Sequence, residues 1–244
     1  MESVINQPFL KQRSQYARWG SYIGFGFLFV GLFSMSRSIL LSYAFMLVGL
    51  IGAAFGSYMA NRYVREPRAD QVFEEALEAL DKRYKMYGYY PPSHYLIASH
   101  YGLTILEPRG QDGEVSYENG RWHHKGGWRK VLQLFGEPSL GKPDQDVQRE
   151  VEWVKEWIDE VLPEDDVLVT GVVVFTGSNV TLHASKAPVP AVKAEDLARH
   201  LKAGLKGNRT LTTAKQKELR SIMDQVVAET EASSKSRKGL FKRG

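Results

Sequence analysis

The chain has 244 residues, of which 43% are hydrophobic and 11% aromatic, so it is able to bury a substantial core. It contains no cysteine, which excludes disulfide frameworks, thiolate metal sites and cysteine nucleophiles. Residues 1–69 carry seven basic and two acidic side chains, residues 70–205 carry fifteen and twenty-two, and residues 206–244 carry ten and four. The formal net charge of +4 therefore arises at the two ends, and it does not indicate nucleic-acid binding by the acidic body.

Two long uncharged stretches dominate the first segment. Eighteen residues separate Arg18 from Arg37, and twenty-four separate Arg37 from Arg62. At ~1.5 Å per residue, each can cross a hydrocarbon core of ~30 Å as a helix, the first only just. The pattern predicts a membrane anchor over residues 1–66 with transmembrane helices at about 19–36 and 38–61. A buried helical hairpin and a cleaved signal peptide fit less well, because the stretches have no polar stripe and no convincing cleavage site.

The turn between these two stretches is short, so both ends of the predicted hairpin emerge on one side of the membrane. Basic residues flank both outer ends, whereas the turn holds Arg37. By the positive-inside bias we expect a multi-pass protein of the cell inner membrane, in contact with the lipid bilayer and with both termini cytoplasmic. Gly52 and Gly56 form a small-xxx-small spacing, which favours close helix packing and suggests self-association through these two residues.

Residues 70–205 have the alternating pattern of an α/β domain. We expect a first helix from Asp70 to near Gly88, because Phe73, Leu77, Leu80 and Tyr84 recur at helical spacing. The other predicted elements are strands at 95–98, 103–106 and 114–117, a helix ending at Pro163, a strand at 167–175, an edge strand at 188–192 and a helix at 195–205. The 167–175 strand is nearly continuously apolar, which is typical of a strand covered on both faces.

The stretch from Gly102 to Val115 reads GLTILEPRGQDGEV. It resembles the nuclease-related domain (NERD) family, whose fold is similar to the restriction-endonuclease-like α/β core. The resemblance covers residues 70–205, and the N-terminal helix pair is similar to that of a membrane-attached subgroup. It implies a restriction-endonuclease-like mixed sheet flanked by helices and preceded by a two-helix transmembrane hairpin. The sequence itself predicts that a C-terminal helix and a basic tail follow over residues 206–244.

The resemblance also assigns residues to the motif positions of the family. These are, in chain order, Ser93-His94 for Asp-His, Glu107 and Arg109 for E-x-K, Gly113 for the following Gly, Lys142-Pro143 with Asp146 for N-P-x-x-Q, and Val172–Phe175 for the later strand. In such a site the carboxylates hold a divalent metal, and the Lys orients or activates the attacking water. Here Ser93 is neutral and Arg109 is too basic to accept a proton, so Glu107 and Asp146 are the remaining candidate metal ligands.

Two functions follow from this set of residues. The first is a membrane-anchored binding or scaffolding module with a degenerate catalytic set and no certain cofactor. The second is an active nuclease that uses Mg²⁺ or Mn²⁺ to hydrolyse DNA or RNA near the membrane. Nucleic acid would then need a basic patch, for which the candidates are Arg121, Lys125, Arg129 and Lys130. A purely structural membrane partner of a larger complex is a third possibility, and the sequence identifies no protein partner.

Three other features have simpler interpretations. His123 and His124 are adjacent and have no third ligand at metal-binding spacing, so we expect them in a loop. Trp153 and Trp157 share one helix face and are expected to pack against the sheet or a neighbour. A C-terminal helix is expected from the capping-box pattern of Thr213 to Gln216, with a disordered tail from residue 233 that is solvated, or touches anionic lipid or nucleic acid.

Overall fold

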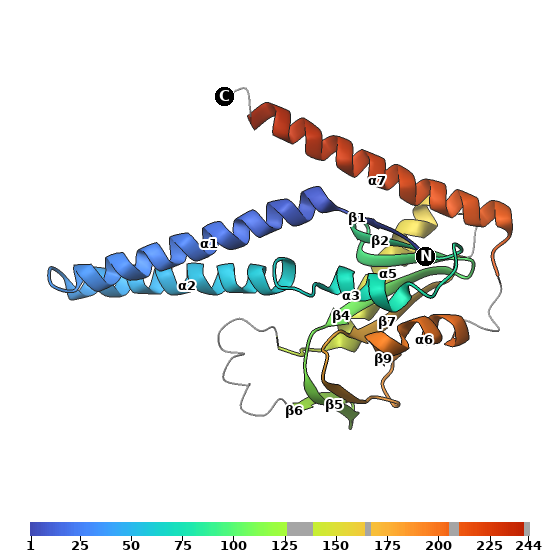
Figure 1. Ribbon diagram of the computed structural model, residues 1–244, viewed down its shortest axis with the longest axis horizontal. Helices are drawn as coiled ribbons and strands as arrows, with labels where there is room; N and C mark the ends of the chain where they lie inside the picture. Colours follow the sequence, from blue (N-terminus) through green and yellow to red (C-terminus); the bar gives the residue numbers. More distant parts are fainter. Residues whose placement is uncertain (126–138, 164–166, 205–209, 242–244) are drawn as a thin grey trace. The chain divides into compact units, whose positions relative to one another are not determined.

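The computed structural model describes residues 1–125, 139–163, 167–204 and 210–241 (Figure 1). The chain divides into two compact units. One is a helical hairpin formed by Gln7–Arg68. The other, here called the α/β unit, contains Met1–Asn6 and the described residues from Ala69 onward, apart from Ser139. The hairpin is therefore inserted into the α/β unit after residue 6, whereas the sequence pattern placed residues 1–66 together in one anchor.

The α/β unit contains a mixed six-stranded sheet in the order β1-β2-β3-β4-β7-β9. Its strands are β1 (Glu2–Ile5), β2 (Lys85–Tyr90), β3 (Ser93–Ser99), β4 (Gly102–Arg109), β7 (Val169–Phe175) and β9 (Ala191–Lys193). Strands β2, β3 and β4 form an antiparallel meander, and β1 adds to β2 in parallel. Strands β4, β7 and β9 are parallel, so β4 and β7 end at the same edge of the sheet.

Helices cover both faces of this sheet (Figure 1). On one face, α5 (Pro143–Val161) and α7 (Thr213–Phe241) contribute Val147, Val154 and Leu219 to a core that includes Leu96 and Ile105. On the other, α3 (Ala69–Leu77) packs its Phe73 ring edge-on against Tyr95 of β3, with the ring centroids 5.1 Å apart. The helix α6 (Leu197–Gly204), preceded by the 3-10 turn η2 (Ala194–Asp196), adjoins α3 and β9. The mixed sheet with flanking helices agrees with the predicted fold class.

Gly171 explains how α5 approaches β7 so closely. A Cβ atom at this position would lie 2.6 Å from a Val147 methyl carbon and 2.8 Å from a Val151 methyl carbon. Such distances are well inside van der Waals contact, so only glycine fits beneath the helix. The single glycine within the apolar run VLVTGVVVF therefore allows the valines of α5 to reach the sheet.

A second sheet of three strands has the order β6-β5-β8. It consists of β5 (Gly113–Glu118), β6 (Arg121–Lys125) and β8 (Val180–His183). Asn119 and Gly120 connect β5 to β6 with φ values of +51° and +74°, as expected of a tight hairpin turn at an Asn-Gly dipeptide. His123 and His124 lie on β6 rather than in a loop, and alternation places their side chains on opposite faces.

The first helix of the α/β unit is shorter than its apolar spacing predicted. Helix α3 ends at Leu77, and the chain then forms strand β2 where the sequence predicted helix up to Gly88. Leu80 and Tyr84 are buried, as the prediction required, but they lie in the turn between the two elements. The Asp81 side chain stabilises that turn by accepting a hydrogen bond of 2.8 Å from the backbone N–H of Arg83.

Strand β1 was absent from the sequence prediction, and it pairs with the edge of β2 that β3 does not occupy. Glu2 to Ile5 pair with Lys85 to Gly88 in parallel register. The N-terminal ammonium of Met1 donates a hydrogen bond of 2.7 Å to the carbonyl of Leu80, which fixes the start of the chain. Four residues beside a long apolar segment carry too little pattern to predict a strand.

The hairpin consists of two long helices, α1 (Gln7–Ser34) and α2 (Ile39–Tyr63), which pack antiparallel. Glycines line their contact: a Cβ atom at Gly49 would lie 2.7 Å from the backbone N of Leu28, and one at Gly56 would lie 2.5 Å from the backbone N of Ser21. A Cβ atom at Gly24 would overlap the backbone of Ala53. Gly52 also faces α1, so the small-xxx-small motif serves packing within one chain. Self-association through Gly52 and Gly56 stays a prediction.

The outward surfaces of this hairpin are apolar. Large hydrophobic side chains from both helices are exposed, including Phe33 at 77% and Leu40 at 83%. Among the described residues, α2 is the one helix long and apolar enough to cross a membrane, and 17% of its most apolar eighteen-residue window is buried. Helix α1 is not such a helix, because its uncharged part, residues 19–34, is shorter than that of α2 and follows directly on Arg18.

Helix α7 is part of the α/β unit and is longer than predicted. Asp224 accepts hydrogen bonds of 2.9 Å from both the Lys85 ammonium and the Tyr87 hydroxyl, and Glu231 accepts one of 3.0 Å from Tyr90. The helical backbone continues to Phe241, so the prediction of a disordered tail from residue 233 is wrong for residues 233–241. Residues 233–241 are rich in Lys, Arg and Ser and contain no proline. The helical part of α7 that packs against the sheet can therefore continue into them.

The N-terminal cap of α7 lies one residue before the predicted one. Thr212, rather than Thr213, accepts a hydrogen bond of 3.3 Å from the backbone N–H of Lys215. Gln216 donates from its side-chain amide to the Leu211 carbonyl at 2.8 Å. A threonine and Gln216 therefore both form hydrogen bonds at the helix start, as predicted, but the capping threonine is Thr212 instead of Thr213.

Candidate functional site

The structure brings three of the predicted site residues together at the carboxyl end of β4. Glu107 and Arg109 are two positions apart on this strand and share one face, while Asp146 lies in the first turn of α5. The Arg109 guanidinium donates a hydrogen bond to Glu107 and another, of 2.5 Å, to Asp146. The Arg109 and Glu107 side chains are 15% and 17% exposed, so the ion pairs are largely shielded from solvent.

The cluster continues outward along α5. Arg149 forms an ion pair with the other carboxylate oxygen of Asp146, across one helical turn. Its side chain is mostly exposed, so this outer pair contributes much less than the inner two. Two arginines and two carboxylates thus alternate in the order Glu107, Arg109, Asp146, Arg149, and their formal charges cancel.

Ser93 does not join this ion-pair chain directly. It begins β3, is buried, and directs its hydroxyl to the Tyr95 carbonyl at 3.4 Å. Beside it lies Glu150 of α5, which accepts a hydrogen bond of 3.1 Å from the backbone N–H of His94. Burial raises the pKa of the Glu150 carboxyl, but hydrogen bonds from His94 and Ser93 outweigh it and hold this pKa below its ordinary value.

Glu150 is the site residue that the sequence reasoning missed. It lies four positions after Asp146 on the same helix, so both carboxylates point toward the β3–β4 end of the sheet. That i, i+4 spacing was the available signal, but no motif position of the resembled family falls on residue 150. The described part of the cluster therefore holds three carboxylates, Glu107, Asp146 and Glu150, and two arginines.

The positions of the carboxylates do not form a metal site in the part of the chain that the structure describes. No group of three or more His, Asp or Glu side chains there has the arrangement needed to hold a metal ion. The proposed ligand pair Glu107 and Asp146 instead share the Arg109 guanidinium, which supplies the positive charge between them. The two carboxylates are thus arranged around the Arg109 guanidinium rather than around a site for Mg²⁺ or Mn²⁺.

Two further carboxylates that follow Glu107 closely in the sequence, Asp112 and Glu114, have separate partners. Asp112 accepts a hydrogen bond of 3.0 Å from the backbone N–H of Asn179, and Glu114 forms an ion pair of 3.4 Å with Lys125. Of the expected basic patch, Arg121 and Lys125 lie on β6. Arg129 and Lys130 lie outside the described residues. Trp157 packs against the core, as expected of this helix, whereas Trp153 is exposed.

Comparison of the chain with protein-family models, with curated proteins and with solved structures finds no match.

Proposed function

We propose that this protein is a membrane-anchored binding or scaffolding module, whose hairpin α1–α2 spans the bilayer. The apolar outer surface of the hairpin is the observation that carries this proposal. A soluble helical pair would bury its large hydrophobic side chains, whereas here they are exposed along both helices. Exposing so extensive an apolar surface to water is unfavourable. The hydrocarbon core of a bilayer, about 30 Å thick, is an environment in which these side chains are stable.

The connectivity supports a defined topology. Residue 6, just before α1, and residue 69, just after α2, belong to the same folded unit. A folded domain does not straddle a bilayer, so both ends of the hairpin lie on the side of the α/β unit. The basic residues Lys11, Arg13, Arg62 and Arg65 at those ends support the proposal that this side is cytoplasmic and that the protein lies in the cell inner membrane.

The α/β unit is proposed to be a nuclease-related, restriction-endonuclease-like domain that binds without hydrolysing. The mixed sheet with helices on both faces, and the convergence of Glu107, Arg109 and Asp146, support this reading. Hydrolysis needs a metal or a group that accepts a proton from water. A guanidinium does not accept one, and here it forms ion pairs with both carboxylates that would bind a metal.

An active metal-dependent nuclease is the second candidate function. The observation that favours it is the gathering of Glu107, Asp146 and Glu150 at one edge of the sheet. A divalent metal would then use carboxylates from β4 and α5, and nucleic acid would approach the cluster from the exposed Arg149 side. This arrangement requires Arg109 to turn away from both of its carboxylate partners.

A cleavage assay separates the two functions. The full-length protein in detergent is incubated with labelled single- and double-stranded DNA and RNA in Mg²⁺ or Mn²⁺, beside the Glu107→Ala variant. We expect no cleavage by either protein. Metal-dependent cleavage that disappears in Glu107→Ala would establish the nuclease and overturn the binding-module proposal. The double change Ser93→Asp with Arg109→Lys tests whether restoring the motif is sufficient to restore hydrolysis.

A further inference from the structure

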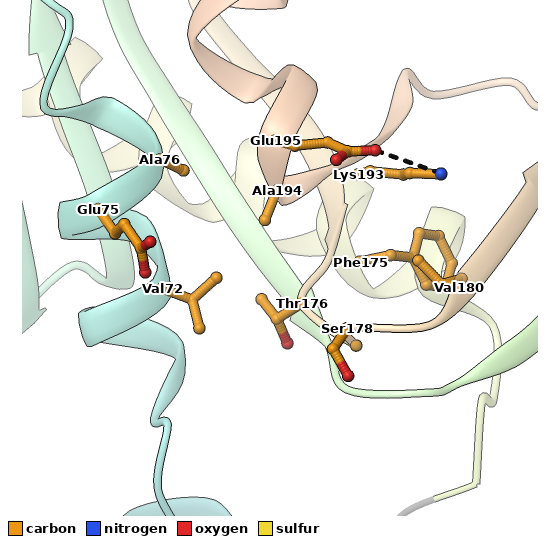
Figure 2. Close-up of a pocket in the computed structure, with 11 residues that line it drawn as sticks. Val72, Glu75, Ala76, Phe175, Thr176, Ser178, Val180, Lys193, Ala194 and Glu195 are labelled. Carbon is orange, nitrogen blue, oxygen red and sulfur yellow. Dashed lines mark hydrogen bonds and ion pairs between the residues drawn. The ribbon is translucent and has the colours of Figure 1, made fainter.

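A pocket of about 270 Å³ opens beside the carboxyl ends of β7 and β9 (Figure 2). Its wall is formed by α3, by the loop from β7 to β8, and by the start of η2. Glu107, Arg109 and Asp146 do not line it, so it is separate from the ion-pair cluster. Ligands of α/β proteins commonly bind outside the carboxyl ends of parallel strands, where connecting loops supply polar groups around an apolar floor.

The pocket combines an apolar interior with a small number of polar groups. Val72 and Ala76 supply partly exposed apolar surface, whereas Phe175 and Val180, which also line the pocket, are buried. The hydroxyls of Thr176 and Ser178 lie at its lower rim in the view of Figure 2. The Thr176 hydroxyl donates to the Arg109 carbonyl at 3.4 Å, which leaves its oxygen free to accept a hydrogen bond.

The charges that line the pocket favour a cation. Lys193 and Glu195 form an ion pair of 3.3 Å and so neutralise each other. The Glu75 carboxylate stands on the opposite side of the pocket in Figure 2, and among the described residues it has no hydrogen-bond or ion-pair partner. The pocket therefore carries one uncompensated negative charge, beside an apolar wall.

We propose that this pocket binds a small organic cation, a primary alkylammonium or alkylguanidinium, through the Glu75 carboxylate. The cationic head would pair with Glu75 and donate to the Thr176 and Ser178 hydroxyls, while its apolar stem packs on Val72 and Ala76. An anion of the same size would be repelled by the Glu75 and Glu195 carboxylates, and the Lys193 ammonium is already paired with Glu195. The volume suits a stem of a few carbons rather than a nucleotide or a large cofactor.

Three probes of similar size but different charge show whether binding depends on the charge or only on the shape of the ligand. They are n-butylammonium, n-butanol and butyrate. Binding to the full-length protein in detergent micelles is measured by saturation-transfer NMR and by titration. We expect n-butylammonium to bind and the other two to bind at least about tenfold more weakly, as one charge-assisted hydrogen bond implies. Agmatine, which carries a guanidinium and an ammonium, tests the second head group.

Matched variants locate the binding to this pocket. Glu75→Gln removes the proposed anchor, and Glu78→Gln makes the same charge change three residues away, outside the pocket. Ala76→Leu fills the pocket without changing its charge. We expect about tenfold weaker binding in Glu75→Gln and in Ala76→Leu, and unchanged binding in Glu78→Gln. Thermal unfolding of each variant verifies that the α/β unit remains folded.

The proposal is overturned if no cation binds, if butyrate binds as well as n-butylammonium, or if Glu75→Gln and Glu78→Gln weaken binding equally. A result in which inorganic phosphate binds and Lys193→Met abolishes that binding would assign the pocket to anions instead.

Discussion

The Arg109→Met variant tests how much the shielded ion pairs stabilise the α/β unit. Methionine keeps a long side chain but removes the guanidinium that Glu107 and Asp146 share. The inner pair with Glu107 is largely shielded, and a charge-assisted hydrogen bond in such a position is worth ~1.5–3 kcal/mol. Asp146 is 35% exposed and keeps Arg149, so losing its second pair costs only ~0–1 kcal/mol.

The expected loss in the free energy of unfolding is therefore about 1.5–4 kcal/mol. For a chain of this size it lowers the midpoint of thermal unfolding by roughly 3–16 °C. Thermal unfolding of the full-length protein in a mild detergent, followed by near-ultraviolet circular dichroism, measures this midpoint. The double variant Glu107→Gln with Arg109→Met is the control, because it removes the Glu107 negative charge together with the Arg109 guanidinium.

We expect the double variant to be more stable than Arg109→Met alone, because a largely shielded carboxylate that has lost the Arg109 guanidinium is the main cost. A coupling energy of at least ~1 kcal/mol between the two positions would follow. If Arg109→Met shifts the midpoint by less than about 1 °C, the ion pairs contribute nothing and the reasoning about the site is wrong. The same conclusion follows if the two changes are simply additive.

Three further predictions concern the hairpin, the Glu150 carboxylate and helix α7. Gly24→Val should destabilise the packing of α1 on α2 by more than ~3 kcal/mol, because a side chain there overlaps the backbone of the partner helix. Gly26→Val should be tolerated, because a Cβ atom at Gly26 has nothing within 4 Å. Thermal unfolding of the two variants in detergent compares them. Glu150 has a folded-state pKa below its ordinary 4.5, so its contribution to stability is present above about pH 4.5 and is lost as the pH falls through the lower folded pKa. Glu150→Gln should accordingly lose less stability than the natural protein between about pH 5 and pH 3, as measured by the unfolding midpoint. Asp224→Asn should weaken the docking of α7, which faster hydrogen exchange in that helix reports, because the Lys85 ammonium and Tyr87 hydroxyl lose their shared anionic acceptor.

Each of these predictions has an outcome that contradicts it. Equal unfolding midpoints for the two glycine variants would show that α1 and α2 do not approach as closely as described. An unchanged acid response in Glu150→Gln would mean that its hydrogen bonds from His94 and Ser93 are lost in solution. Unchanged exchange in Asp224→Asn would assign the docking of α7 to its apolar contacts alone.

The sequence predicted the elements whose pattern is local and strong. Helix α5 and strands β4 and β7 were found because a valine stripe at helical spacing and continuous apolar runs have few other interpretations. The β5–β6 turn followed from Asn119-Gly120, since this dipeptide adopts positive φ angles readily. Glu107, Arg109 and Asp146 were also named from the sequence, and the structure places them in one cluster.

The sequence did not predict the features that depend on distant pairing. Strand β2 reads as helix because Leu80 and Tyr84 continue the spacing of Phe73 and Leu77. Its pairing with β3 and with β1, some eighty residues earlier, decides otherwise. The role of Arg109 as the shared partner of two carboxylates depends on where α5 crosses β4, which no local pattern records. Glu150 was missed for the same reason.

The membrane topology is the central claim, and single-cysteine labelling tests it most directly. The natural chain has no cysteine, so Ser36→Cys in the α1–α2 turn and Glu78→Cys in the α/β unit each introduce one reactive thiol. Intact cells are treated with a membrane-impermeant maleimide before and after lysis. We predict that Ser36→Cys is labelled in intact cells and that Glu78→Cys is labelled only after lysis. Labelling of both positions only after lysis, with recovery of the protein in the soluble fraction, would contradict the spanning hairpin.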